Sequence, residues 1–166
     1  PWKGDAAGGD VHYLSSCATG RIVRALVADV AGHGDKVARI SERLRDLMRK
    51  YVNYVDQRAV VRALNRQFTE PEFAGRFATA VMVTFWTPTD EVDITCAGHP
   101  RPLLYEATTR SWGIMPDSPR ANDADESRTD LPLGIDEAVY GRVRVKMGPR
   151  DLLLLYSDAL VEAGVE

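Results

Sequence analysis

The chain has 166 residues, of which 45% are hydrophobic and 27% charged, and its formal net charge is −3 at pH 7. These values are typical of one soluble globular domain with a sizeable core. The apolar runs are too short to span a bilayer, no export signal is recognisable, and the two cysteines resemble neither a disulfide framework nor a zinc motif. We therefore predict a cytoplasmic protein that binds no membrane.

The first half of the chain predicts a hairpin followed by two helices. Residues 10–18 and 21–30 read as strands joined by a turn at Gly20. From about Asp35 the apolar residues recur at steps of three and four, which is typical of amphipathic helices. The first helical stripe contains Val37, Ile40, Leu44, Leu47, Met48, Tyr51 and Val55, and the second, from about Gln57, contains Val60, Val61, Leu64 and Phe68.

The second half returns to strands. A near-continuous apolar run at 77–87 is typical of a strand buried on both faces, and further strands are predicted at 92–98, 102–107, 140–147 and 152–158. The polar, acidic stretch Pro116 to Asp130 reads as a surface loop. Because strands and helices do not alternate, we predict an α+β fold of packed antiparallel sheets with the helices covering one side.

Three aspartates stand next to the ends of predicted strands. Asp10 follows two glycines at the start of the first strand, Asp29 lies near the end of the second, and Asp158 ends the strand at 152–158. Hard cations such as Mg²⁺ and Mn²⁺ prefer carboxylate and carbonyl oxygens, and glycines let the backbone approach an ion. Each aspartate alone is weak evidence for a metal site, because aspartates begin and end loops in most proteins.

Five motifs in a fixed order carry a family resemblance. They are "GGD" at 8–10, "DVAGHG" at 29–34, "AGHPRPLLY" at 97–105, "LPLGI" at 131–135 and "LLLLYSDALVEA" at 152–163. Together they resemble the metal-dependent serine/threonine phosphatases of type 2C. The similarity is greatest to the bacterial branch typified by SpoIIE and RsbU, which controls sigma-factor partner switching. It runs over nearly the whole chain.

This resemblance implies an αββα sandwich, two antiparallel sheets flanked by helices, with a centre of two Mn²⁺ or Mg²⁺ ions at one edge. Asp10 and Asp29 resemble the ligands of one ion, the backbone carbonyl of Val30 would add an oxygen, and Asp158 resembles a further ligand. Ions that share these ligands would hold a hydroxide for in-line attack on a phosphoserine or phosphothreonine. The glycines after Asp29 would let Val30 turn its carbonyl inward.

Two histidines lie within these motifs. His33 is open to two interpretations: it protonates the leaving hydroxyl as a general acid, or it packs behind the loop and bonds to backbone while metal-bound water serves as the acid. His99 is expected to fix a turn between two strands.

The chain departs from the family pattern at two points. Ala159 stands where the family has a glycine after the aspartate, which is tolerable if the backbone there has a negative φ. The sequence also stops at Glu166, before the family's final strand and its Asp-rich motif. Either the sequence is incomplete at this end or the protein lacks one metal ligand. The resemblance implies a single domain over residues 1–166 without the family's final strand segment.

The distribution of charge suggests a second kind of function. Between Asp35 and Arg66 there are nine Lys/Arg and four Asp/Glu, so this region has an excess of +5 and the remainder carries −8. A basic helix face is either a solvated exterior or a docking surface for an acidic partner.

The leading hypothesis is a phosphoprotein phosphatase whose substrate is an anti-sigma-factor antagonist. The alternative is a non-catalytic pseudophosphatase that binds its partner through the helix between Lys36 and Lys50. A phosphatase for small phosphoesters is less favoured because no nucleotide-binding fingerprint is present. We expect no nucleic-acid partner, and the sequence leaves a homodimer open.

Overall fold

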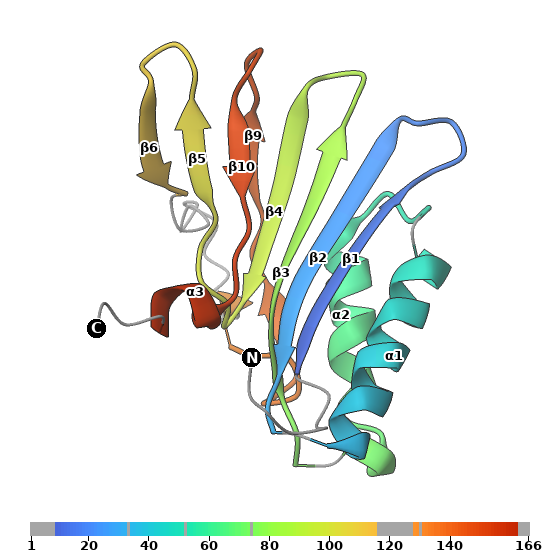
Figure 1. Cartoon of the computed structure of the whole chain (residues 1–166). Helices are drawn as coiled ribbons and strands as arrows, with labels where there is room; N and C mark the ends of the chain where they lie inside the picture. Colours follow the sequence, from blue (N-terminus) through green and yellow to red (C-terminus); the bar gives the residue numbers. More distant parts are fainter. Residues whose placement is uncertain are drawn as a thin grey trace.

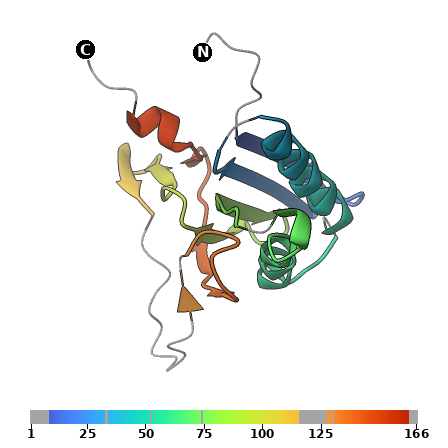
Figure 2. The same cartoon turned by 90° about the horizontal axis from the view of Figure 1, so that it is seen from below.

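The computed structural model describes residues 9–32, 34–51, 53–73, 75–115, 128–129 and 131–162. They form an α+β fold in layers: two helices cover one face of a five-stranded sheet, and a three-stranded sheet packs on its other face (Figures 1 and 2). The predicted fold class is therefore confirmed. Among the described residues, no helix has the length and apolar character needed to cross a membrane.

Both sheets are antiparallel. The larger has the order β1-β2-β3-β4-β9, formed by β1 (Asp10–Ser16), β2 (Ile22–Val30), β3 (Ala78–Trp86), β4 (Glu91–Ala97) and β9 (Val143–Lys146). The smaller has the order β10-β5-β6, formed by β5 (Leu103–Glu106), β6 (Ser111–Ile114) and β10 (Leu152–Leu154). A short parallel ladder joins β7 (Arg128–Thr129) and β8 (Val139–Tyr140).

Helices α1 (Asp35–Tyr51) and α2 (Gln57–Gln67) bury the stripes that the sequence predicted. The side chain of Asp56 caps α2 by accepting a hydrogen bond from the backbone N–H of Arg58. Burial of a side chain such as Leu44 stabilises the fold by roughly 1.5–3 kcal/mol. The helix residues in this core are Val37, Ile40, Leu44, Leu47, Met48, Val60, Val61 and Leu64, and they meet Leu26, Ala28, Val30, Ala80 and Met82 of the sheet.

The opposite face of the larger sheet packs on the smaller one. Strand β3 contributes to both cores, since Met82 faces the helices whereas Val81 and Val83 face the second sheet. Its prediction as a strand buried on both faces is confirmed. The smaller sheet turns its other face outward, where Trp112, Ile114, Leu152 and Leu154 are exposed.

Three local predictions differ from the structure. Val55 was expected in the first helical stripe, but α1 ends at Tyr51 and Val55 is exposed. The strand predicted at 152–158 ends at Leu154 and is half-exposed rather than buried, because it lies in the outer sheet. Asp158 therefore begins a short helix, α3 (Asp158–Glu162), instead of ending a strand.

Strands β6 and β7 were not predicted. Both are short, and β7 lies within the stretch 116–130 that was interpreted as a loop. The rest of that stretch, residues 116–127 and 130, lies outside the described residues.

Candidate metal centre

The β1–β2 pair brings Asp10 and Asp29 directly opposite each other. The backbone N–H of Val30 donates to the carbonyl of Gly9 at 3.1 Å, so the neighbouring Asp10–Asp29 pair is a non-hydrogen-bonded pair. In such pairs the Cα atoms are only about 4.5 Å apart and both side chains lie on one face. Like charges in this arrangement destabilise a sheet, and a cation between them would remove that cost.

Gly9 lets two oxygens approach this strand end. A Cβ atom at Gly9 would stand 2.2 Å from the carbonyl oxygen of Val30 and 2.5 Å from Oδ1 of Asp29, far inside van der Waals contact. Only glycine fits here without displacement of one of the two. The Val30 carbonyl and the Asp29 carboxylate, both predicted as ligand atoms, thus gather beside the start of β1.

The loop after Val30 relies on glycine for its backbone conformation. Gly32 and Gly34 have φ values of 109° and 88°, a region that other residues rarely adopt. The predicted need for a glycine loop behind Asp29 is therefore supported. His33, between the two glycines, lies outside the described residues, and both interpretations of it stay predictions.

His99 connects the two sheets beside this strand end. Its Nδ1 lies 2.9 Å from Oγ1 of Thr79, and its Nε2 lies 2.9 Å from the carbonyl oxygen of Tyr156. Thr79 is the β3 residue directly opposite Asp29. The sequence predicted only a local turn for His99, whereas the ring joins segments that are distant in sequence.

Asp158 approaches from the smaller sheet. It is exposed, and it begins α3 two residues after Tyr156. Burial lowers the pKa of His99, while the Tyr156 carbonyl and the charges of Asp158 and Asp10 oppose that shift. Both carboxylates are thus close enough to act on the same imidazole. Ala159 lies inside α3 and has no positive φ, so the negative φ required there is present.

The carboxylates of Asp10 and Asp29 and the carbonyl of Val30 are chemically suited to a hard divalent cation, because carboxylate and carbonyl oxygens are the donors that Mg²⁺ and Mn²⁺ prefer. Asp158 does not complete a compact set: within the described ranges, no three His, Cys, Asp or Glu side chains gather closely enough to hold an ion. The geometry thus brings Asp10, Asp29 and Val30 together and places Asp158 across His99 from them.

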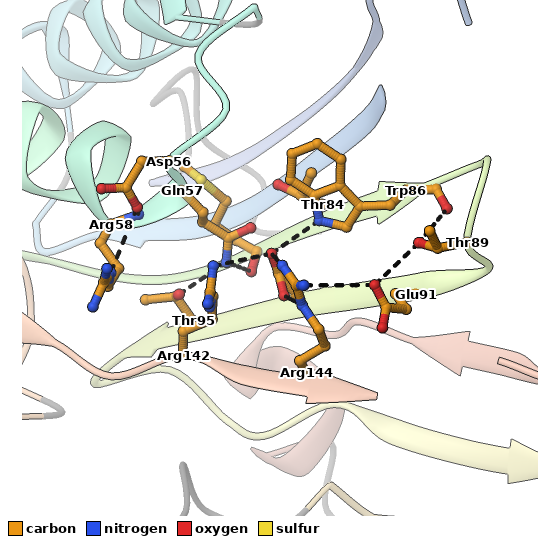
Figure 3. Close-up of polar contacts among 12 residues, drawn as sticks. Asp56, Gln57, Arg58, Thr84, Trp86, Thr89, Glu91, Thr95, Arg142 and Arg144 are labelled. Carbon is orange, nitrogen blue, oxygen red and sulfur yellow. Dashed lines mark hydrogen bonds and ion pairs between the residues drawn. The ribbon is translucent and has the colours of Figure 1, made fainter. Parts of the chain in front are cut away.

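A second polar cluster crosses the same sheet on its helix-facing side. The buried Asp93 carboxylate accepts from Nε and Nη2 of Arg144 at 2.6 and 2.8 Å and from Nε1 of Trp86 at 2.9 Å. Figure 3 shows Trp86, Arg142 and Arg144 around this point. Burial raises the pKa of Asp93, but the hydrogen bonds from Arg144 and Trp86 outweigh it and hold the pKa below the ordinary 3.8.

Sequence reasoning missed Thr79 and Tyr156 at this end of the sheet, although it gave the glycines before Asp10 a role in letting the backbone approach an ion. Thr79 is a polar residue at the start of an apolar run, which is a weak signal. Tyr156 acts through its backbone carbonyl, so no side-chain pattern could have indicated it.

A comparison with protein families decides the relationship. The family model described as Stage II sporulation protein E (SpoIIE) matches residues 19–166. The chain belongs to the SpoIIE family. The predicted resemblance to this branch of the type 2C phosphatases is therefore confirmed.

Solved structures share this SpoIIE-family fold. The RsbU and RsbW domains of Rv1364c from Mycobacterium tuberculosis are 24% identical with a TM-score of 0.78, and the match covers 98% of this chain and 42% of that one. The PP2C phosphatase domain of SpoIIE from Bacillus subtilis is 18% identical with a TM-score of 0.69, and the match covers 97% of this chain and 46% of that one. RsbX in complex with magnesium is 16% identical with a TM-score of 0.68, and the match covers 90% of this chain and 65% of that one. The chain thus spans less than half the length of the first two structures.

Proposed function

We propose that this chain is the phosphatase domain of a Mn²⁺- or Mg²⁺-dependent enzyme that hydrolyses phosphoserine or phosphothreonine in a protein. The observation that carries the proposal is the pair of carboxylates facing each other across β1 and β2, with the Val30 carbonyl beside them, in a chain of the SpoIIE family. A relative of the same fold was solved with magnesium, which supports the choice of metal.

The residues have distinct proposed roles. Asp10, Asp29 and the carbonyl of Val30 hold one cation, and Asp158 contributes to a second. The bound ions supply Lewis acidity to the phosphoryl oxygens and lower the pKa of water. Gly9 keeps the approach to the carbonyl clear of side-chain atoms.

The proposed substrate is a phosphorylated anti-sigma-factor antagonist. A relative solved as RsbU and RsbW domains and one described with the bacterial stressosome support a role in bacterial signalling. The role we propose is partner switching, which requires a protein substrate. The proposed location is the cytoplasm.

A non-catalytic binding function is the second candidate. It is favoured by the separation of Asp158 from the Asp10–Asp29 pair and by the basic residues exposed along α1, namely Lys36, Arg39, Arg43, Arg49 and Lys50. In that case partner binding persists in chelator and no hydrolysis occurs.

Hydrolysis of an aryl phosphate and of a phosphoserine peptide, with Mn²⁺ titrated in, separates the two functions. We expect turnover that rises with Mn²⁺ and is lost in Asp29→Asn. The matched control is Asp46→Asn on α1, which makes the same charge change at an exposed ion pair and should retain turnover. Turnover by Asp29→Asn equal to that of the unmodified chain would contradict the phosphatase proposal.

A further inference from the structure

His99 is buried, with only 6% of its surface exposed, and both nitrogens of its imidazole have a hydrogen-bond partner. One partner, Thr79, belongs to β3 of the larger sheet, and the other, Tyr156, belongs to the segment between β10 and α3. The ring is therefore a cross-link between the two halves of the candidate metal centre.

The direction of each hydrogen bond follows from the partners. The carbonyl of Tyr156 can only accept, so Nε2 of His99 carries a proton and donates it. Burial lowers the pKa of His99 and so disfavours the charged ring, and in the neutral ring a proton on Nε2 leaves a lone pair on Nδ1. The hydroxyl of Thr79 must then donate to Nδ1.

This direction matters for Asp29, because Thr79 lies opposite it with its side chain on the same face of the sheet. A threonine hydroxyl has one proton, and here that proton is committed to His99. Thr79 consequently offers lone pairs rather than a proton toward the carboxylate end. At the other side of the ring, the bond to Tyr156 fixes the segment that leads into Asp158 two residues later.

We propose that Thr79 and His99 are positioning residues that set the spacing between the Asp10–Asp29 pair, which holds one proposed cation, and Asp158, which contributes to the second. They need not touch the ion. This inference rests on the proposed metal-dependent function and concerns residues to which that function gave no role.

Matched variants of Thr79 test it directly. Thr79→Val keeps the shape of the side chain but removes the hydroxyl, whereas Thr79→Ser keeps the hydroxyl. Because outer groups that orient metal ligands typically contribute 10- to 100-fold to affinity, we expect Thr79→Val to weaken Mn²⁺ binding by about 10- to 100-fold and Thr79→Ser to retain it. Calorimetric titration with Mn²⁺ alone measures this without any turnover.

Gln and Ala at position 99 extend the series. The Nε2 amide of glutamine can still donate to the Tyr156 carbonyl, so His99→Gln should bind Mn²⁺ more tightly than His99→Ala. Thermal unfolding of each variant in chelator shows whether a loss of affinity only reflects a loss of folding. Equal Mn²⁺ affinity in Thr79→Val and the unmodified chain would overturn the proposal.

A nitrogen-15 spectrum of the imidazole provides a second, independent readout. We expect Nε2 to be protonated and Nδ1 to be unprotonated in the metal-free protein, and a proton on Nδ1 at neutral pH would overturn the assigned direction. Failure of the proposed function has a different signature. Asp29→Asn would then bind Mn²⁺ like the unmodified chain, whereas failure of this inference alone leaves Asp29→Asn impaired and Thr79→Val unaffected.

Discussion

Two rows of residues cross the five-stranded sheet about 17 Å apart along β2, given a rise of roughly 3.3 Å per residue. One row runs through Arg24, Thr84, Asp93 and Arg144 and faces the helices. The other runs through Asp10, Asp29 and Thr79 and faces the opposite side. In the first row two guanidinium groups flank one carboxylate, with the Thr84 hydroxyl between Arg24 and Asp93, whereas in the second row two carboxylates stand side by side.

The difference separates a structural role from the binding role proposed for Asp10 and Asp29. Asp93 obtains its positive partners from the protein itself, and Arg24 uses its guanidinium to hold the carbonyls of Tyr51 and Tyr54 at the end of α1. This row therefore stabilises the fold without any ligand. The Asp10–Asp29 pair instead places two carboxylates directly opposite each other, and like charges in such a cross-strand pair favour a cation bound between them.

The largest expected effect comes from breaking the first row. Asp93→Asn removes the buried negative charge that interacts with the guanidinium groups of Arg24 and Arg144. We therefore expect the free energy of unfolding to fall by on the order of 3 kcal/mol. Urea unfolding measures the change. Asp46→Asn, at an exposed ion pair with Arg49, should cost less than about 1 kcal/mol. Equal losses in the two variants would contradict the structural role of Asp93.

The second prediction concerns the space beside the Asp10–Asp29 pair. Gly9→Ala places a Cβ 2.2 Å from the carbonyl oxygen of Val30, which should lower stability by about 1–3 kcal/mol and weaken Mn²⁺ binding at the same time. Gly113→Ala in β6 is the control, since no atom lies within 4 Å of its added Cβ. Calorimetry with Mn²⁺ on both variants checks the result, and unchanged affinity in Gly9→Ala would refute the ligand role of this strand end.

The third prediction is a pH dependence with a defined sign. The pKa of His99 is lowered from 6.5 mainly by burial, so the unfolded chain takes up a proton at a higher pH than the folded one. The free energy of unfolding should therefore fall as the pH drops below 6.5 and level off beneath the folded-state pKa. Urea unfolding measured from about pH 8 to about pH 5 should show this fall in the free energy of unfolding. In His99→Gln the part of the fall that comes from protonation of residue 99 should be absent.

The smallest effect is a gain in stability. In chelator, Asp10→Asn removes the repulsion from Asp29 and should raise the free energy of unfolding by about 0.2–1 kcal/mol. Added Mn²⁺ should then stabilise the unmodified chain and leave the variant unchanged. If chelator-treated Asp10→Asn is less stable than the unmodified chain, the two carboxylates do not repel in the way the register implies.

Much of this molecule follows from its sequence, because local patterns specify local structure. The hairpin, the stripes of α1 and α2 and the apolar strand β3 are encoded by periodicity and turn residues, and the pair Asp10 and Asp29 was identified from motifs. Thr79 and Tyr156 were missed because their importance depends on strand register and on a backbone carbonyl, neither of which leaves a pattern along the chain. The exposed side of β10 was missed because an apolar run does not reveal which layer it joins.

Among the strands that the structure describes, β1 lies at the edge of the larger sheet and pairs only with β2. It can separate from the sheet without breaking any other ladder, and edge segments of this kind open at a lower free energy than central strands. Because Asp10 is the first residue of that strand, opening would carry one carboxylate away from the other. A cation shared by Asp10 and Asp29 would link β1 to β2 and make opening of this edge less favourable. Slower amide hydrogen exchange along β1 would therefore report metal binding even where no substrate is known.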